Sequence, residues 1–431
     1  MATPERLALL WGGSFFAGSL AQLVARLSGI PVVVLLLASG LLVGEAGLGL
    51  IHPSLLGQGL EPLVGLLVCL VLFDGGLNLR LASRTLQRSL LQLVLVRSLL
   101  GFAGGALLAH WLAGLSWPLA LVYGAIALAT GPTVVTPLVR QMRLSPDLAR
   151  LLEAEGLILE PVGAVLALLL LQLALGDLQR WQDVALSLLL RVGGGALIGG
   201  ATGLLLSLLL QRLGSSPEPA PAADAGDGLP PRLPGIDAVA GSTLPLQITL
   251  GMLFLLFGGC EALLPESGLP AAVCAGVVVG LRLEGTASLL DALIAQLALL
   301  AITVLFPLLA ADVSWGELLL LGGGGVLCVL ALTPARWLVL QIAGLGLPFS
   351  AAEKLMLTWI APRGIVTAAV ASLFALQLDQ AGVEGGPALK GLVFLTILLT
   401  VGLQGVSAPW LARRLGLCDG PAEESAPAAS S

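Results

Sequence analysis

The sequence predicts an all-α integral membrane protein of about thirteen transmembrane helices, arranged as two inverted repeats with broken, crossing helices five and twelve. Three observations predict this fold class. The 431 residues are 57% hydrophobic and only 11% charged, with a mean hydropathy of +1.01, whereas about a quarter of the residues in a soluble domain are charged. Apolar runs of roughly 20 residues, the length that crosses a bilayer, recur almost to the C-terminus. Two of these runs are interrupted by proline beside glycine or a charge.

Division of the apolar sequence at its polar and Pro/Gly-rich breaks gives the individual spans. The predicted spans cover 7–26, 30–48, 60–79, 87–112, 117–139, 149–176, 183–211, 245–264, 268–283, 289–311, 315–343, 350–377 and 388–411. Residues 214–241 have the Pro, Ala, Gly and Asp content of a linker and divide seven spans from six. The prediction is therefore a membrane domain over 1–417 and a short, disordered tail over 418–431.

Basic residues predict the orientation, because cytoplasmic connections of membrane proteins are rich in Lys and Arg. With the N-terminus outside, most of the 20 Lys and Arg residues fall on the cytoplasmic side, Arg336 and Lys354 among them. The opposite side keeps Arg6, Arg180 and Lys390. We expect a bacterial inner membrane protein with its N-terminus outside and its C-terminus in the cytoplasm.

Two spans are not expected to form unbroken helices. The span over 117–139 contains Thr130, Gly131 and Pro132, and the span over 350–377 contains Pro362 and Arg363. Proline removes a backbone donor and clashes with the preceding turn, so the helix opens. The two breaks lie seven spans apart, and this odd offset gives them opposite orientations, as inverted repeats require. Ordinary proline kinks are the alternative.

Ionisable residues within the spans are few, and each needs a partner or a function. Glu160 is followed by Pro161 and an apolar run, so it is expected to lie deeper than Glu153 and Glu155. Burial disfavours the charged form of a carboxylate, so Glu160 is expected to hold either a proton or a cation. Competition of this kind suffices for exchange. The alternative is an ion pair between Glu160 and a buried arginine.

Arg363 carries a permanent charge in an opened helix and needs a counter-charge. We predict a structural ion pair between Glu155 and Arg363. Asp74 precedes Gly75 and Gly76 near the end of its span. It is either a cation attractor at a cavity mouth or an interfacial capping residue.

Other kinds of site are not expected. His52 and His110 are far apart and the five cysteines lack metal-ligand spacing, so we predict no metal site and no cofactor. Basic residues form no cluster that would bind nucleic acid. Because there is no nucleophile with a base and no phosphate loop, an enzyme is not expected.

Four motifs resemble those of the monovalent cation/proton antiporter family, in particular bacterial sodium/proton antiporters related to eukaryotic sodium/proton exchangers. Residues 73–78 resemble its third-helix F-E-G-G-L motif and residues 129–132 its A-T-D-P motif. The run 153–161 resembles E-G-E-S-L-L-N-D-G, and residues 362–364 match the arginine of helix twelve. The motifs occur in the family's order, and the resemblance covers nearly the whole chain.

The resemblance implies a homodimer in the lipid bilayer that exchanges sodium, potassium or lithium for protons. By position it places the ion-binding carboxylate on Glu160 and the arginine-pairing glutamate on Glu155. The family's other polar ligands fall on Leu159, Gly131 and Gly156, which carry no oxygen in their side chains. Thr130, Thr133 and opened backbone carbonyls are the expected substitutes, because hard cations accept neutral oxygen ligands.

Two alternative functions remain open from the sequence. One is a potassium/proton efflux system that a separate subunit regulates. The other is a carrier of organic solutes with the same architecture, which would need a larger polar cavity than one carboxylate and a few hydroxyls provide.

Overall fold

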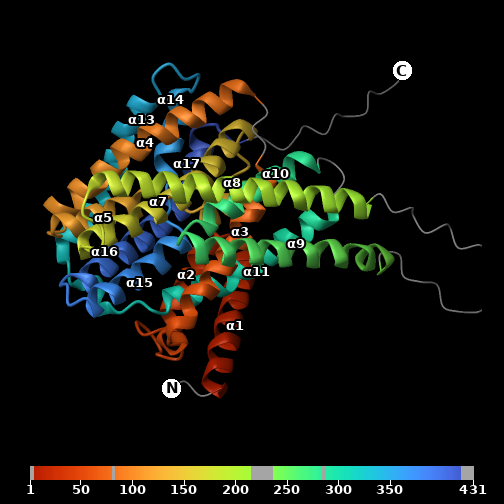
Figure 1. The fold of residues 1–431 in the computed structure, drawn as a ribbon. Coiled ribbons are helices and arrows are strands. Elements are labelled where there is room, and N and C mark those ends of the chain that lie inside the picture. Colours follow the sequence, from red (N-terminus) through yellow and green to blue (C-terminus); the bar gives the residue numbers. More distant parts are fainter. Residues whose placement is uncertain (1–3, 80–82, 215–235, 284–287, 419–431) are drawn as a thin grey trace, which may run out of the picture. The chain divides into compact units, whose positions relative to one another are not determined.

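The computed structural model describes residues 4–79, 83–214, 236–283 and 288–418, and the described residues are predominantly helical (Figure 1). The first half of the chain forms α1 (Pro4–Ser28), α2 (Val32–Val43), η1 (Pro53–Gly59), α3 (Leu60–Asn78), α4 (Arg84–Trp111), α5 (Trp117–Leu128), α6 (Pro132–Met142), α7 (Pro146–Leu175) and α8 (Trp181–Gly214). The second half forms α9 (Ile236–Leu263), α10 (Gly268–Arg282), α11 (Ser288–Ala310), α12 (Trp315–Leu319), α13 (Gly322–Ala343), α14 (Ala351–Trp359), α15 (Ile365–Gln380), α16 (Gly386–Leu399), η2 (Thr400–Gln404) and α17 (Gly405–Arg414).

The helices account for the predicted spans. Among the described residues, nine helical segments are long and apolar enough to cross a membrane, and Val32–Val43, Pro62–Asn78 and Gly268–Arg282 are shorter apolar helices. The pair α14 and α15 makes up the remaining predicted span. Most of the predicted linker, 215–235, and of the predicted tail, 419–431, lies outside the described residues. Helix α9 begins at Ile236, so the predicted linker extended too far.

Both predicted breaks are present. α5 ends at Leu128 and α6 begins at Pro132, and α14 ends at Trp359 while α15 begins at Ile365. Pro132 occupies the first position of α6, where its missing N–H costs nothing. These spans are opened, because three and five residues respectively are not helical, so the alternative of simple proline kinks is wrong.

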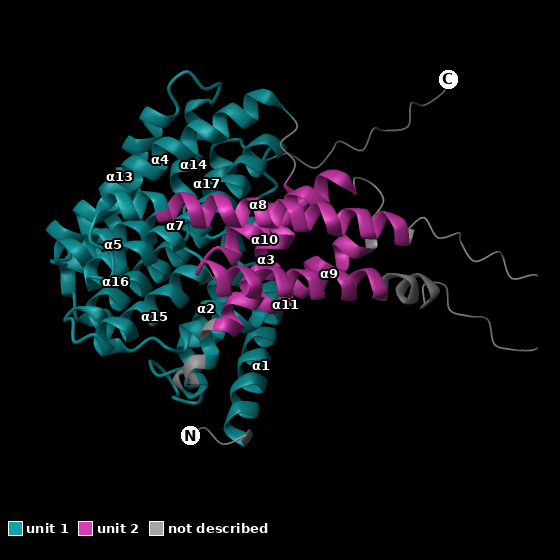
Figure 2. Cartoon of the chain, viewed as in Figure 1, with its two compact units in different colours: residues 1–61, 80–186, 303–431 teal, residues 62–79, 187–302 magenta. Residues whose placement is uncertain are grey.

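The chain forms two compact units (Figure 2). Unit 1 comprises Met1–Glu61, Arg80–Leu186 and Thr303–Ser431, and unit 2 comprises Pro62–Leu79 and Ser187–Ile302. In unit 2, α10 packs closely against α3 and α8 through small residues. A Cβ atom on Gly76 would lie 2.5 Å from the carbonyl oxygen of Val273, and one on Gly203 would lie 2.6 Å from that of Ala275. Small residues allow such close helix contacts in membranes.

Helices α5, α6 and α7 form the interior of unit 1. The segment Trp117–Met142 is 89% buried over its apolar window, whereas Glu5–Ser28 is 28% buried. Close approach again depends on glycine, since a Cβ atom on Gly105 of α4 would lie 3.2 Å from the Cα of Gly124 in α5. The broken helix is therefore enclosed by protein, where an opened backbone can be tolerated.

Candidate ion-binding site at the helix crossing

The two helix breaks meet in unit 1. The amide of Gly131 donates a hydrogen bond to the carbonyl of Pro362, with an N···O distance of 3.1 Å. A Cβ atom on Gly131 would overlap the backbone of Gly364. Glycine is therefore required where the two opened segments cross. The predicted crossing of the broken helices is confirmed.

Glu160 of α7 lies beside this crossing and is fully buried. A Cβ atom on Gly364 would lie 2.5 Å from Glu160 Oε1. Among the described residues, neither carboxylate oxygen has a hydrogen-bond partner of normal geometry, although the backbone amide of Val366, in the first turn of α15, lies near the carboxylate. A buried polar group without a partner costs free energy, so this carboxylate is suited to take up a proton or a cation.

Two threonines lie at or beside this crossing. A Cβ atom on Gly131 or on Gly364 would lie 3.3 Å from Thr133 Oγ1. Thr130 lies within the break of α5 and α6, and both hydroxyls are buried with no hydrogen-bond partner among the described residues. Carboxylate and hydroxyl oxygens are hard ligands of the kind that a hard cation prefers.

The ends of the broken helices carry partial charges that differ in sign. α15 begins directly after Gly364, so its positive N-terminal end faces Glu160. At the C-terminal end of α5, the Arg363 guanidinium donates to the carbonyl of Ala129 at 2.8 Å. At that of α14, Arg336 donates to the carbonyls of Leu357 and Ile360 at 2.7 and 3.2 Å. Each negative helix end is thus capped by an arginine.

The predicted pair of Glu155 with Arg363 is wrong. Glu155 binds Arg97 of α4 and Arg336 of α13 instead, the latter at 3.2 Å. Glu160 lies five positions after Glu155 in α7. At 3.6 residues per turn this offset places the two carboxylates on different faces of the helix. Glu155 therefore faces α4 and α13, while Arg363 caps α5.

Sequence reasoning missed the roles of Arg97 and Arg336. Arg97 stands in the middle of an apolar span, which signals a buried charge, but a sequence does not reveal its partner. Arg336 was expected on the cytoplasmic side, yet it is buried within α13. Charges that close a helix break depend on tertiary contacts and not on local pattern.

The opened backbone of α14 and α15 is also supported by η2, a π-helical segment. Gln404 Oε1 accepts a hydrogen bond from the amide of Ala361 at 3.0 Å, and Thr400 Oγ1 accepts one from the amide of Arg363 at 3.4 Å. π-Helical turns are rare and often occur at functional sites. Here the segment satisfies amides that the broken helix leaves without partners.

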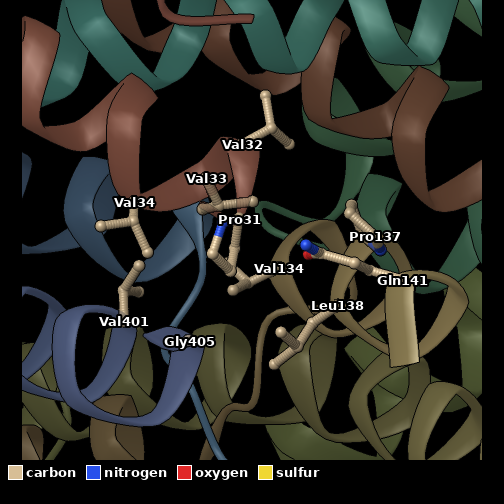
Figure 3. Close-up of a pocket in the computed structure, with 10 residues that line it drawn as sticks. All are labelled: Pro31, Val32, Val33, Val34, Val134, Pro137, Leu138, Gln141, Val401 and Gly405. Carbon is tan, nitrogen blue, oxygen red and sulfur yellow. The ribbon is translucent and has the colours of Figure 1, made fainter. Parts of the chain in front are cut away.

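A small cavity of about 30 Å³ lies near α6, between the start of α2 and the η2–α17 junction (Figure 3). Apart from the amide of Gln141, its lining side chains are apolar. Its wall reaches Val134, one residue from Thr133. The cavity touches the crossing segment, but its lining offers no charged ligand for an ion.

Comparison with known proteins identifies the family. The profile described as "Sodium/hydrogen exchanger, transmembrane" matches residues 13–222 and 241–414. The chain belongs to the sodium/hydrogen exchanger family. The chain shares its fold with the sodium proton antiporter MjNhaP1 from Methanocaldococcus jannaschii at pH 8, with a TM-score of 0.78 and 23% identity over 96% of this chain and 99% of that one.

Curated relatives of the exchanger include antiporters for two cations. It is 28% identical over 212 residues to "Na(+)/H(+) antiporter ApNhaP" of Aphanothece halophytica, covering 48% of this chain and 39% of that protein. It is 29% identical over 208 residues to "K(+)/H(+) antiporter NhaP" of Alkalimonas amylolytica, covering 45% of this chain and 34% of that protein. The match to "Probable Na(+)/H(+) antiporter 2" of M. jannaschii is longer, with 23% identity over 84% of this chain and 83% of that protein. The chain thus spans well under half of the length of ApNhaP and of the A. amylolytica antiporter.

The backbone is closely packed at two positions, Gly131 and Gly156, where the family resemblance places polar side chains. An aspartate at Gly131 would overlap Gly364. A Cβ atom on Gly156 would lie 3.0 Å from the carbonyl oxygen of Thr130, so a larger side chain would press on the break. Leu159 is fully buried and contributes no oxygen.

Asp74 belongs to α3 in unit 2, so it is not among the residues that converge in unit 1. It is half-buried, and its Oδ1 accepts a hydrogen bond from Asn78 at 3.1 Å. Its role as cation attractor or as capping residue stays a prediction.

Proposed function

We propose that this exchanger is a secondary active antiporter in which a monovalent cation and a proton compete for Glu160. The observation that carries the proposal is that the side-chain oxygens of Glu160, Thr130 and Thr133, residues at or beside the helix crossing, are buried and have no hydrogen-bond partner of normal geometry in the described part of the chain. With a proton, the carboxyl is neutral. With a cation, it is neutralised by the ion, and the two hydroxyls supply further ligands.

Exchange follows if only the two neutral forms change between outward and inward openings. A bare carboxylate is disfavoured in the closed interior, because an unpaired buried charge is costly. A proton gradient then drives cation movement in the opposite direction.

Sodium and potassium are both proposed cations, since relatives bear the names of antiporters for either one. We further propose a homodimer in a bacterial inner membrane. A carrier of organic solutes would need a larger polar cavity than one carboxylate and two hydroxyls provide.

The test uses the purified protein in proteoliposomes that contain a pH dye and hold a proton gradient. Addition of sodium, potassium or lithium should release the trapped protons in wild type, and Glu160→Gln should reduce the rate to that of empty liposomes. Asp379→Asn is the matched control, because this carboxylate is exposed on α15. The proposal fails if no cation moves protons, or if Glu160→Gln transports as fast as Asp379→Asn.

A further inference from the structure

Three arginines converge on one small cavity of unit 1, away from the apolar cavity at α6. The cavity has a volume of about 30 Å³, and Arg97, Arg336 and Arg363 line it together with glycines and apolar side chains of α4, α5 and α13. The three residues are only 3% to 7% exposed. Arg97 lies in the middle of α4, at membrane depth. Such a concentration of positive charge in the interior needs compensation.

The groups that contact these arginines supply too little negative charge. Glu155 provides one negative charge to Arg97 and Arg336. The C-terminal ends of α5 and α14, which Arg363 and Arg336 cap, contribute about half a charge each. Three positive charges against about two negative ones leave roughly one positive charge uncompensated.

Unsatisfied hydrogen-bond donors also indicate that this cavity favours an anion. Among the described residues, Arg336 Nη1 and Arg363 Nε have no hydrogen-bond partner, and both residues line the cavity. Buried guanidinium donors without acceptors cost free energy. An acceptor that carries one negative charge would satisfy both the donors and the charge.

We propose that the cavity binds one small monovalent anion, such as chloride, between the guanidinium groups of Arg336 and Arg363. Its volume of about 30 Å³ exceeds the ~10–15 Å³ that an occupant the size of a water molecule needs, so it admits a monatomic anion. The anion would lock α13 and the crossing segment together, because the two arginines cap the ends of the broken helices. It is thus a structural ligand and not a transported one.

The experiment measures the thermal unfolding of the purified protein with chloride, bromide or gluconate as the sodium salt at one ionic strength. We expect chloride and bromide to raise the Tm over gluconate by at least about 2 °C, with a saturable dependence on concentration. Equal Tm values in chloride and gluconate would overturn the proposal, since water alone would then fill the cavity.

The second test uses substitutions that fill the cavity with a larger side chain. Gly101 lines the cavity, and a Cβ atom there would lie 3.5 Å from Leu128, which also lines it. Gly101→Val should therefore abolish the chloride shift without changing any charge. Gly104→Val, at a lining position with open space around the Cβ, repeats the test should the first variant not fold.

Gly12→Val is the control, because Gly12 also has open space but lies on α1. It should keep the full chloride shift. A shift that persists in both cavity variants places the anion elsewhere and overturns the proposal, as does a shift that Gly12→Val loses as well.

Discussion

Glu155 and Glu160 are two buried glutamates on one helix with opposite surroundings. Glu155 is bound by two arginines, whereas Glu160 has no hydrogen-bond partner of normal geometry among the described residues. The first is held in its charged form. The second loses little when it becomes neutral, and this difference separates a structural carboxylate from an exchanging one.

Removal of each charge should therefore affect stability in opposite ways. Glu155→Gln leaves Arg97 and Arg336 without their counter-charge, and loss of one partner of a buried pair costs about 3–5 kcal/mol. We expect a clear fall in the Tm of the purified protein. Glu160→Gln, the control on the same helix, should leave the Tm equal or higher. Equal falls in both variants would contradict this assignment of roles.

Residue chemistry could be predicted from the sequence where the signal is local. Glu160 was singled out because it precedes Pro161 and an apolar run, and Thr130 and Thr133 because their hydroxyls stand at a predicted helix break and can replace the missing polar ligands. The partner of Glu155 could not be predicted, because three arginines lie within reach of the crossing and only the fold selects Arg97 and Arg336. The glycine pair of 131 and 364 likewise gains its meaning only when the breaks are seen to meet.

At the scale of elements, each broken helix is completed by groups from other helices. The two C-terminal ends are capped by arginines, and two amides of the α14–α15 break are satisfied by η2. Proline and glycine made both breaks predictable. The π-helical segment was not predictable, because residues 388–411 have the apolar composition of an ordinary span.

Gln404 gives a test of this support. Gln404→Leu removes the acceptor for the amide of Ala361 at nearly constant volume, so a buried donor is left unsatisfied at a cost of about 1–3 kcal/mol. We expect a lower Tm and faster hydrogen exchange in residues 360–364. Gln380→Leu, at an exposed position of α15, should change neither. Unchanged exchange in Gln404→Leu would show that η2 does not hold the break.

At the scale of the whole molecule, the predicted odd number of crossings would place the two ends of the chain on opposite sides of the membrane. The predicted orientation puts the C-terminal end in the cytoplasm. Cys418 is a native reporter just beyond α17, since it is a free, partly exposed thiol.

A membrane-impermeant thiol reagent should label Cys418 in inverted membrane vesicles and not in intact cells. The variant Ala2→Cys, made together with Cys418→Ser, should show the reverse pattern. Labelling of Cys418 from outside the cell would reverse the proposed orientation. If both ends were labelled from the same side, the chain would cross the membrane an even number of times, contrary to the prediction.

Gly131 has a consequence for energetics. Because the crossing leaves no room for a second carboxylate there, the proposed site relies on the carboxylate of Glu160, which binds either one proton or one monovalent cation. Each turnover then moves no net charge, so transport should be electroneutral. In liposomes with equal potassium on both sides, valinomycin clamps the membrane potential at zero, and the rate of sodium-driven proton release should be the same with or without it. Faster release under the clamp would mean that the cycle moves charge. With no charge displaced, the proposed antiporter would work from the concentration gradients of its two ions alone, and a membrane potential without a pH gradient would not drive it.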